Sequence, residues 1–561
     1  MYLDFLVGIP DVPGKITRRK KGGTRYINYE YGRDYDPKRK FNIPLRATIG
    51  KQDENDNTKM YPNQNFLKHF PDAELPPEKG RTSRSSCLRV GSFIIIRKII
   101  ADYCLDMMLE RIIGRDSGLF LDIAAYSIIC ENNAGQYYPD YAYNHPLFTS
   151  AMKVYSDSKV SDFLQSVTND QSVAFLNEWN EKRNHREKIY ISYDSTNKNC
   201  QVGDIEMVEY GKAKDDKGLK IFNYAIAYDI DNREPLFYEE YPGSIVDVSQ
   251  LQYMLEKAKA YGYKKVGFIL DRGYFSRANI QFMDSCGYDF VIMVKGMGNL
   301  VSALITGNQG TFEKDRSCSI GEHHVYGTTV RQKLYESDTG NRYFHLFHSI
   351  SKEHAEREAL EAKIKRMSAL LRKNEGKIVS FGKAYAEYFD LYYNEDGSKF
   401  LFAKEKAGVI EREIGLCGYF AMVTSEKMTA KVAIGLYKSR DASEKLFRGD
   451  KSYLGNKSIR VYSDESASAK IFIEFVALII RSKIYTSLKD EVLENEKKAN
   501  FMTVPAALKE LEKIEMVRQF DSVYRLDHAV TATQKAILKA FAVDADYIRT
   551  NAKALGEQLV K

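Results

Sequence analysis

The stretch from residue 188 to residue 298 constrains the fold most. Three strand-like patterns in succession give way there to alternating strands and helices. In KIYISYDST, Ile189, Ile191 and Tyr193 fall on one face of a strand and Asp194 on the other, because successive side chains of a strand alternate. Such a series predicts an α/β fold with a mixed sheet and helices packed on it. The three strands are expected in 188–196, 218–230 and 234–243, and the following strands end near Asp271 and Lys295. Helices are predicted at 247–263 and 276–288, the second with Ser276 as its N-cap.

Changes in composition and hydrophobic pattern divide the remainder of the chain into further parts. The expected parts are a basic N-terminal module with linker (1–90), a helical domain (91–187), the first part of the sheet core (188–298), an inserted β-rich subdomain (299–415), the second part of the core (416–490) and a C-terminal helical region (491–561). Residues 52–90 are rich in Asp, Asn, Pro and Ser, and they are expected to form loop and linker.

Composition sets the broad class of the protein. A hydrophobic fraction of 44% is ordinary for a folded chain. The apolar runs are too short and too charged for a membrane span of about 20 residues, and no secretory signal pattern opens the chain. The seven cysteines are scattered without a CxxC pair, which favours a reducing compartment. We therefore expect a cytoplasmic protein.

Positive charge is concentrated near the N-terminus. Residues 15–51 carry twelve Lys or Arg against three acids, a net +9 that exceeds the +7 of the whole chain. Such a block is typical of a surface that binds a polyanion such as nucleic acid. It could equally be a flexible basic arm, although residues 24–35 and 40–50 resemble a strand pair around a DPKRK turn. The candidate DNA-binding cations are Arg18, Arg19, Lys20, Lys38 and Arg39.

Two aspartates are expected to meet at one end of the sheet. Asp194 lies near the end of the first strand, and Asp271 ends the strand that follows the first crossover. A right-handed crossover can return the fourth strand beside the first, which would make the two residues neighbours. Glu444, on a helix packed over that end, could add a third carboxylate. Converging carboxylates suit Mg²⁺, and two such ions can assist phosphodiester cleavage.

A second pattern surrounds Glu444. Tyr437, Arg440, Glu444 and Lys451 follow one another at helical spacing in GLYKSRDASEKLFRGDKSYLG. The stripe could be an exposed salt-bridged face, which would contribute little to stability. It could also be a metal ligand beside a phosphate clamp, because Arg and Lys bind phosphate well.

These motifs resemble a known family. The spacing Tyr437-x₂-Arg440-x₃-Glu444-x₆-Lys451 is similar to the YREK signature of bacterial DDE transposases of the insertion-sequence-four family. The resemblance covers about 185–485 and includes four further motifs, although Ser244 stands where the family usually has Asn. Those motifs are YDSTN (193–197), GKAKDDKG (211–218), PGSIVDVSQL (242–251) and LDRGYFSRANI (270–280).

The resemblance implies a structure and an activity. It implies an RNase H-like core with a subdomain inserted between Asp271 and Glu444. Asp194, Asp271 and Glu444 would be the catalytic residues and would bind two Mg²⁺ ions, for which Mn²⁺ could substitute. The activity would be cut-and-paste DNA transposition by hydrolysis and strand transfer. DNA contacts are expected from Tyr437, Arg440, Lys451 and Lys295.

The same resemblance implies partners. They are double-stranded DNA, both the terminal inverted repeats and the target, and a second copy of the chain in a synaptic complex. The C-terminal helical region is a candidate for the dimer contact. The expected location is the bacterial cytoplasm, in association with the nucleoid.

Several alternatives stay open. The protein could be a non-catalytic DNA-binding relative or a structure-specific nuclease on the same fold. A tyrosine recombinase is formally possible, but no Arg/His cluster singles out one of the 39 tyrosines. No glycine-rich nucleotide fingerprint favours ATP use. A zinc site in the inserted region is conceivable, although the spacing of its candidate ligands is loose. Those ligands are Cys318, His323, His324, His345, His348 and His354.

Overall fold

The computed structural model describes most of the chain, and the chain forms two compact units. The described residues are 2–3, 5–38, 40–75, 84–183, 187–200, 205–212, 218–295, 297–442, 445–446, 449, 451, 454, 458–494 and 502–560. One unit comprises Met1–Cys130, Ala134–Phe163 and Ile484–Lys561, and the other comprises Glu131–Asn133 and Leu164–Lys483. None of the helices in the described ranges is long and apolar enough to span a membrane.

The N-terminal module is a five-stranded antiparallel sheet. The expected hairpin is confirmed, because Asp36 pairs with Phe41 across the DPKRK turn. The expected loop at 52–90 is wrong in part: it contains a strand that pairs with β4, a helix capped by Asn63 and a further short strand. Pairing and burial of Met60 outweigh the polar composition there. The strands are β1 (Val7–Gly8), β2 (Ile16–Lys21), β3 (Thr24–Asp36), β4 (Phe41–Gln52) and β5 (Lys59–Pro62), in the order β1-β5-β4-β3-β2, with α1 (Gln64–His69).

The helical part of the first unit includes the C-terminal segment. Cys87–Arg89 pairs with Glu515–Val517 in a three-stranded sheet, and a Cβ added at Gly91 would lie 2.2 Å from the Leu511 carbonyl oxygen. The division expected between 91–187 and 491–561 therefore differs from the structure, because the short strand at 87–89 finds its partner 426 or more residues later. The elements are β6 (Cys87–Arg89), α2 (Gly91–Asp102), α3 (Leu105–Ile113), α4 (Ser117–Cys130), α5 (Tyr138–Asn144), α6 (Asp157–Ser166), α17 (Val504–Leu511), β18 (Glu515–Arg518), β19 (Tyr524–Leu526), α18 (Ala532–Lys539) and α19 (Ala545–Val560).

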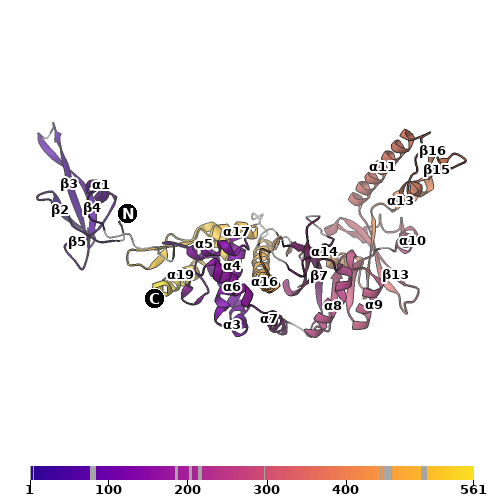
Figure 1. Ribbon diagram of the computed structural model, residues 1–561, viewed down its shortest axis with the longest axis horizontal. Coiled ribbons are helices and arrows are strands. Elements are labelled where there is room, and N and C mark those ends of the chain that lie inside the picture. The colour runs from indigo at the N-terminus through magenta and orange to yellow at the C-terminus, as the bar shows by residue number, and fades with distance from the viewer. Residues whose placement is uncertain are drawn as a thin grey trace. The chain divides into compact units, whose positions relative to one another are not determined.

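The second unit is built on a nine-stranded mixed sheet (Figure 1). Its first three strands form an antiparallel meander, and β10 then returns parallel to β7, as the sequence predicted. The order β9-β8-β7-β10-β11 is consistent with an RNase H-like core. The strands are β7 (Ile189–Asn199), β8 (Ile221–Asp229), β9 (Glu234–Pro242), β10 (Val266–Leu270), β11 (Asp289–Met293), β12 (Ser319–Ile320), β13 (Val325–Gln332), β14 (Arg342–His348) and β17 (Tyr419–Thr424).

Helices cover both faces of this sheet. Tyr193 contacts the ring of Tyr274, next to α8 and α9, whereas Tyr238 contacts Phe475 of α16. Because Tyr238 pairs with Ile226, and Ile226 with Asp194, the Asp194 side chain belongs to the α16 face. The expected Ser276 cap of α9 is confirmed. The helices are α7 (Asn169–Glu181), α8 (Asp247–Ala260), α9 (Arg277–Cys286), α14 (Ala430–Ser439) and α16 (Asp464–Glu494).

The region 299–415 is not the mostly-β insertion that the sequence suggested. Its strands β12–β14 extend the main sheet through β17, since the open edge of β17 needs hydrogen-bonding partners. The separate remainder is a long helix packed on a hairpin, with Phe400 buried between them (Figure 1). Its elements are α11 (Ile350–Lys373), α12 (Lys383–Tyr388), β15 (Phe389–Tyr393), β16 (Phe400–Glu405) and α13 (Ala407–Leu416), preceded by α10 (Gly298–Asn308).

A buried charged layer joins β7 to α16. Lys198 is 1% exposed and is ion-paired with Glu474, which is 3% exposed. The Lys198 ammonium also lies 4.5 Å from the centre of the Tyr224 ring. Lys470, one turn before Glu474, is buried as well, and burial lowers its pKa to about 7. The packing of α16 against the sheet therefore depends on the charge states of Lys198, Glu474 and Lys470.

Breaking the buried pair should destabilise the second unit. Lys198→Met leaves the Glu474 carboxylate buried without a counter-charge and should cost about 3–5 kcal/mol. The double variant Lys198→Met/Glu474→Leu should recover most of that loss. Urea unfolding monitored by tryptophan fluorescence measures the stability of this unit, because Trp179 is the only tryptophan of the sequence and lies in it. A double variant as unstable as the sum of the single variants would contradict the pairing.

Lys470 should make stability depend on pH. Between pH 7 and its ordinary value of 10.5, the unfolded chain holds a proton on Lys470 that the native state lacks. Stability should therefore rise with pH in that window, by up to about 1.4 kcal/mol per unit. Lys470→Met should flatten the rise and stabilise the protein below about pH 7. Urea midpoints of both proteins across the window measure the difference, and parallel curves would refute the assignment.

Candidate active site

Asp194 and Asp271 occupy neighbouring positions on two parallel strands. Leu270 of β10 pairs with Tyr193 of β7, and each aspartate is the next residue of its strand or strand end. Neighbouring strands lie about 5 Å apart, so the structure brings these two carboxylates together. Asp194 Oδ1 accepts a hydrogen bond of 2.8 Å from the Ser195 amide, and Asp271 precedes a short 3₁₀ turn, Arg272–Tyr274.

The C-terminal end of α14 contacts the second aspartate. The Tyr437 hydroxyl donates a hydrogen bond of 3.3 Å to Asp271 Oδ1, and Arg440 Nη1 lies 3.2 Å from the same oxygen. The Arg440 side chain is 15% exposed and that of Asp271 is 40% exposed. The Arg440 guanidinium also lies 5.3 Å from the centre of the Tyr437 ring. A cation and a hydroxyl thus contact one carboxylate oxygen at a partly open position.

Buried tyrosines support this end of the sheet from the α8 and α9 face. The rings of Tyr193 and Tyr274 lie 5.4 Å apart, and the Tyr193 hydroxyl donates to Glu239 at 3.2 Å. Burial and the charges of Asp247 and Asp194 hold the pKa of Tyr274 well above its ordinary value. Burial also raises the pKa of Glu239. The sequence analysis missed Glu239 and Tyr274, because only the tertiary structure brings them into contact with Tyr193, the residue before Asp194.

The other predicted residues of the site are placed less fully. Glu444 lies outside the described residues. Lys451 has helical backbone and is half-buried. Lys295 is exposed, two residues beyond the end of β11. Because β11 is parallel to β10, Lys295 lies at the same end of the sheet as Asp271.

The donor set fits a hard divalent cation. Asp194 lies in the middle of β7, and not near its end as the sequence predicted, because pairing with β8 continues to Asn199; Asp271 directly follows β10. Their two carboxylates, on neighbouring strands, provide the oxygen ligands that Mg²⁺ and Mn²⁺ prefer. Within the described ranges, which exclude Glu444, no group of three or more His, Cys, Asp or Glu side chains is placed to hold a metal ion. A complete three-carboxylate site would therefore need Glu444.

Gly211 and Gly243, from two of the motifs noted in the sequence, lie against each other. A Cβ added at Gly211 would lie 1.8 Å from the Gly243 carbonyl oxygen, so the two backbones touch. Ser244, which replaces the usual Asn, donates a hydrogen bond to Glu209. The close approach explains why residue 211 has no side chain.

Two of the candidate zinc ligands of the inserted region, His345 and His348, contact other side chains. His345 Nδ1 and Nε2 lie 2.9 and 3.0 Å from the hydroxyls of Thr329 and Thr424. Burial lowers the pKa of His345 to about 4, so the ring is neutral. His348 Nε2 lies 3.0 Å from Glu353. These contacts satisfy both histidines without a metal.

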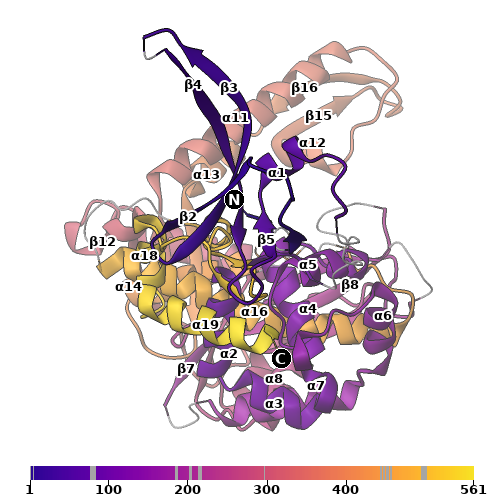
Figure 2. The same cartoon turned by 90° about the vertical axis from the view of Figure 1, so that its left-hand side faces the viewer.

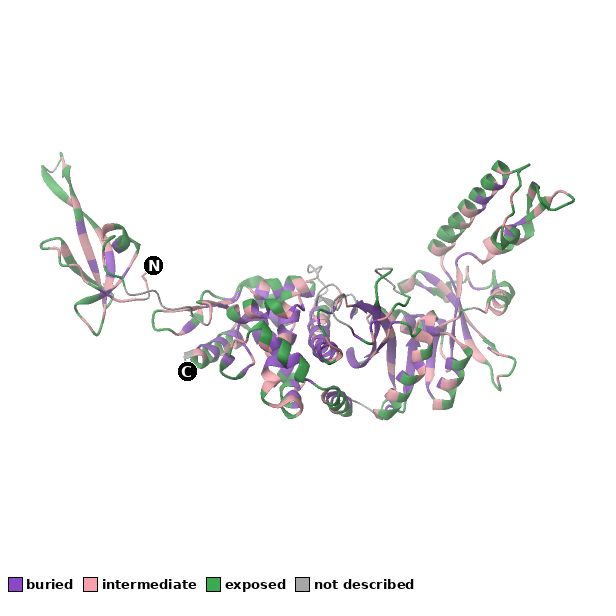
Figure 3. Ribbon diagram, viewed as in Figure 1, coloured by how far each residue is buried: buried purple, intermediate pink, exposed green. Residues whose placement is uncertain are grey.

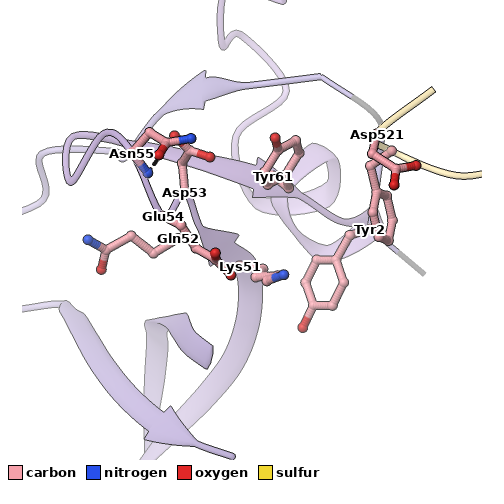
Figure 4. Close-up of a pocket in the computed structure, with 9 residues that line it drawn as sticks. Tyr2, Lys51, Gln52, Asp53, Glu54, Asn55, Tyr61 and Asp521 are labelled. Atoms are coloured by element: carbon pink, nitrogen blue, oxygen red, sulfur yellow. Dashed lines mark hydrogen bonds between the residues drawn. The ribbon is translucent and has the colours of Figure 1, made fainter. Parts of the chain in front are cut away.

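The predicted DNA-binding cations of the N-terminal module are exposed. Arg18, Arg19 and Lys20 lie on β2, and Lys38 lies in the turn between β3 and β4; Arg39 is outside the described residues. One pocket of this first unit contains none of the predicted metal ligands (Figure 4). It is lined by Tyr2, Lys51, Gln52, Asp53, Glu54, Asn55, Tyr61, Phe520 and Asp521.

Comparison with known proteins supplies a family and distant structural similarities. The family model described as "Transposase DDE domain" matches residues 191–480. No curated protein sequence matches the chain. A piggyBac transposase synaptic complex with hairpin DNA is 8% identical, with a TM-score of 0.32, over 72% of this chain and 63% of that one. The Mos1 mariner paired-end complex with Mn is 13% identical, with a TM-score of 0.13, over 24% and 50%. The chain thus spans less than two thirds of either protein.

Asp271 and Arg440 should be energetically coupled. Asp271→Asn and Arg440→Gln should each lower stability, and the double variant should deviate from their sum by about 0.5–3 kcal/mol, because the side chains are in direct contact. Urea unfolding followed by Trp179 fluorescence, with metal removed by EDTA, measures the coupling. Lys431→Gln is a matched control, since Lys431 lies on α14 and its ion-pair partner Glu322, in the turn Gly321–His323, is exposed. Additivity of Asp271→Asn with Arg440→Gln would contradict the contact.

Proposed function

Because the chain belongs to the transposase DDE domain family, we propose that it is a DNA transposase that moves an insertion sequence by a cut-and-paste route. The observation that supports this most is the adjacent placement of Asp194, within β7, and Asp271, at the end of β10, with Arg440 and Tyr437 on the second carboxylate. A carboxylate pair beside a cation provides both metal ligands and a phosphate contact at one place.

Three carboxylates are proposed to hold two divalent cations. Asp194 and Asp271 are the two that the strands bring together, and Glu444, four residues after Arg440, is the third. When bound, two Mg²⁺ or Mn²⁺ ions activate the attacking water or hydroxyl and stabilise the leaving oxygen of a phosphodiester.

The cations around the carboxylates are proposed to hold DNA. Arg440 offers a planar fork of N–H donors that matches a phosphate, and Lys451 and Lys295 offer point charges. In the absence of DNA, Arg440 is paired with Asp271. A phosphate that enters the site therefore competes with Asp271 for Arg440, and a metal ion competes with Arg440 for Asp271.

DNA-end recognition is proposed to lie in the first unit. The basic N-terminal module and the helical segment that follows would bind the terminal inverted repeats, because the net +9 of residues 15–51 attracts phosphates. Two copies of the chain would bring the two ends together, with the C-terminal helices as the candidate contact. Deletion of residues 1–90 without loss of end-specific binding would refute the assignment to this module.

The carboxylates should be essential for strand cleavage. Asp194→Asn, Asp271→Asn and Glu444→Gln should each reduce Mg²⁺-dependent cleavage of the DNA flanking the coding region by roughly a thousandfold or more, since each loses several kcal/mol of transition-state stabilisation. Gel assays of cleavage and of joining to a target plasmid measure both steps, with Lys431→Gln as control. Cleavage without joining would favour the nuclease alternative. Binding without cleavage in the unaltered protein would favour the non-catalytic alternative.

Replacing Arg440 should raise the affinity for a divalent metal ion, whereas replacing a carboxylate should lower it. Arg440→Gln removes the cation that competes for Asp271 Oδ1, so Mn²⁺ should bind the DNA-free protein several-fold more tightly, whereas Asp271→Asn should weaken binding. Titration of free Mn²⁺ by electron paramagnetic resonance measures both affinities without reference to catalysis. Weaker Mn²⁺ binding by Arg440→Gln would contradict the competition.

A further inference from the structure

Asp271 lies just beyond the hydrogen-bonded ladder of its strand. Strands β7 and β10 are largely buried (Figure 3), and their parallel ladder ends at the pair Leu270–Tyr193. The ladder of β10 with β11 also ends at Leu270. Pairing with Ile226 of β8 fixes Asp194 within the sheet. The position of Asp271, by contrast, depends on contacts outside the sheet.

Two sets of contacts hold Asp271. Arg440 and Tyr437 contact its carboxylate oxygen Oδ1. In the proposed function a DNA phosphate and a metal ion compete for this set, so it is weakened when the site is loaded. The second set acts on the backbone, because the Tyr274 amide donates a hydrogen bond of 3.0 Å to the Asp271 carbonyl oxygen and closes the turn Arg272–Tyr274. This second set involves no cation that is proposed to hold DNA.

The Tyr274 side chain attaches that turn to β7. Tyr274 is 2% exposed and is the buried residue of the turn. Its ring centre lies 5.4 Å from that of Tyr193, which is fully buried and directly precedes Asp194. Aromatic pairs at this separation are stabilising beyond the area they bury. One side chain therefore joins the turn that follows Asp271 to the residue that precedes the other aspartate.

Asn279 holds the backbone of the same turn from α9. Asn279 is 1% exposed, and its Nδ2 donates hydrogen bonds of 2.9 Å to two carbonyl oxygens. One belongs to Val248 of α8 and the other to Tyr274. Helices α8 and α9 pack against each other, side by side (Figure 1). The turn is thus tied to both helices that cover this face of the sheet.

Glu239 of β9 completes a closed series of contacts. The Tyr193 hydroxyl donates to Glu239 Oε2 at 3.2 Å, and Gln250 of α8 donates to the same oxygen at 3.4 Å. Gln250 follows Val248 on α8 by two residues. The contacts therefore run from β7 through β9 and α8 to α9 and the turn, and they return to β7 through the ring of Tyr274.

We propose that Tyr274 is a positioning residue that sets the spacing between Asp271 and Asp194, and thereby the affinity of the site for a divalent cation. Two carboxylates bind one ion only if both are held in place, and the residues behind metal ligands orient them. The inference rests on the proposed function for the role of the two aspartates as metal ligands. It assigns this task to the ring of Tyr274 and its contact with Tyr193, and not to the Tyr274 hydroxyl.

Matched substitutions of two buried tyrosines test the assignment. Tyr274→Leu removes the ring, whereas Tyr274→Phe keeps the ring and removes only the hydroxyl. The controls are Tyr388→Leu and Tyr388→Phe. Tyr388 is 4% exposed, but it belongs to the separately packed part in which α11 and α12 lie beside β15 and β16 (Figure 2). Asn279→Ala adds a variant that leaves Tyr274 in place and removes the hydrogen bond to its carbonyl oxygen.

Metal binding by the DNA-free protein is the main measurement. Free Mn²⁺ is titrated by electron paramagnetic resonance, at a temperature below the circular dichroism melting point of every variant. Tyr274→Leu should weaken Mn²⁺ binding by about tenfold or more, as expected for a residue that orients metal ligands. Asn279→Ala should weaken it in the same direction. Tyr274→Phe and both Tyr388 variants should bind Mn²⁺ as tightly as the unaltered protein, although Tyr388→Leu should melt at a lower temperature.

A merely structural role predicts a different pattern. It would lower the melting temperature of Tyr274→Leu and leave the Mn²⁺ affinity of the folded variant unchanged. Unchanged Mn²⁺ binding by Tyr274→Leu and Asn279→Ala would overturn the proposal. Weakening by Tyr274→Phe as large as that by Tyr274→Leu would overturn the assignment to the ring. In DNA cleavage, Tyr274→Leu should lower kcat with little change in KM, because its contacts involve no proposed DNA ligand.

The outcomes separate this inference from the proposed function. If Tyr274→Leu weakens Mn²⁺ binding but the unaltered protein never cuts or joins DNA, the positioning role stands and the transposase proposal fails. If the protein cuts and joins DNA, and Tyr274→Leu binds Mn²⁺ and cuts DNA as the Tyr388 controls do, the positioning role fails alone. Absence of Mn²⁺ binding by the unaltered protein would also overturn the positioning role, since that role requires a shared ion.

Discussion

The parallel pairing of β7 with β10 is the constraint on which the candidate site depends. It matches Leu270 with Tyr193 and so brings Asp194 and Asp271, 77 positions apart in the chain, to adjacent positions on neighbouring strands. Two carboxylates at such a distance repel each other unless positive charge lies between or beside them. The structure places Arg440 there, and the proposed metal ions would serve the same need.

The residues around Asp194 and Asp271 hold the backbone in place and leave a carboxylate accessible. On the α8 and α9 face, Tyr193, Tyr274 and Glu239 are buried and hydrogen-bonded or closely packed, which fixes the backbone of both strand ends. On the other face, Asp271 is partly exposed and contacts the end of α14. Helix α14 itself is fixed by Ile434 and Tyr437 in the core. The reactive groups are therefore displayed by packed elements and not by a free loop.

Much of the secondary structure could be predicted because its signals are local. The alternation of KIYISYDST, the Ser276 cap and the turn between Asp36 and Phe41 all depend on neighbouring residues, and the structure confirms them. The predicted loop at 52–90 failed where β5 gains its hydrogen bonds from β4 and buries Met60. The mostly-β insertion failed because β12–β14 complete an existing sheet.

The sequence by itself determined which residues are available for chemistry: two aspartates at strand ends, a Tyr–Arg stripe at helical spacing, and a dense block of cations. It determined these because alternation along strands and the helical repeat are properties of consecutive residues. Only the tertiary structure decided that Arg440 and Tyr437 contact Asp271, that Glu239 and Tyr274 contact Tyr193 next to Asp194, and that Arg18 and Arg19 lie on opposite faces. Those relations depend on pairing and packing between distant segments, whose register is set by burial of a shared core and carries no signal in any one segment.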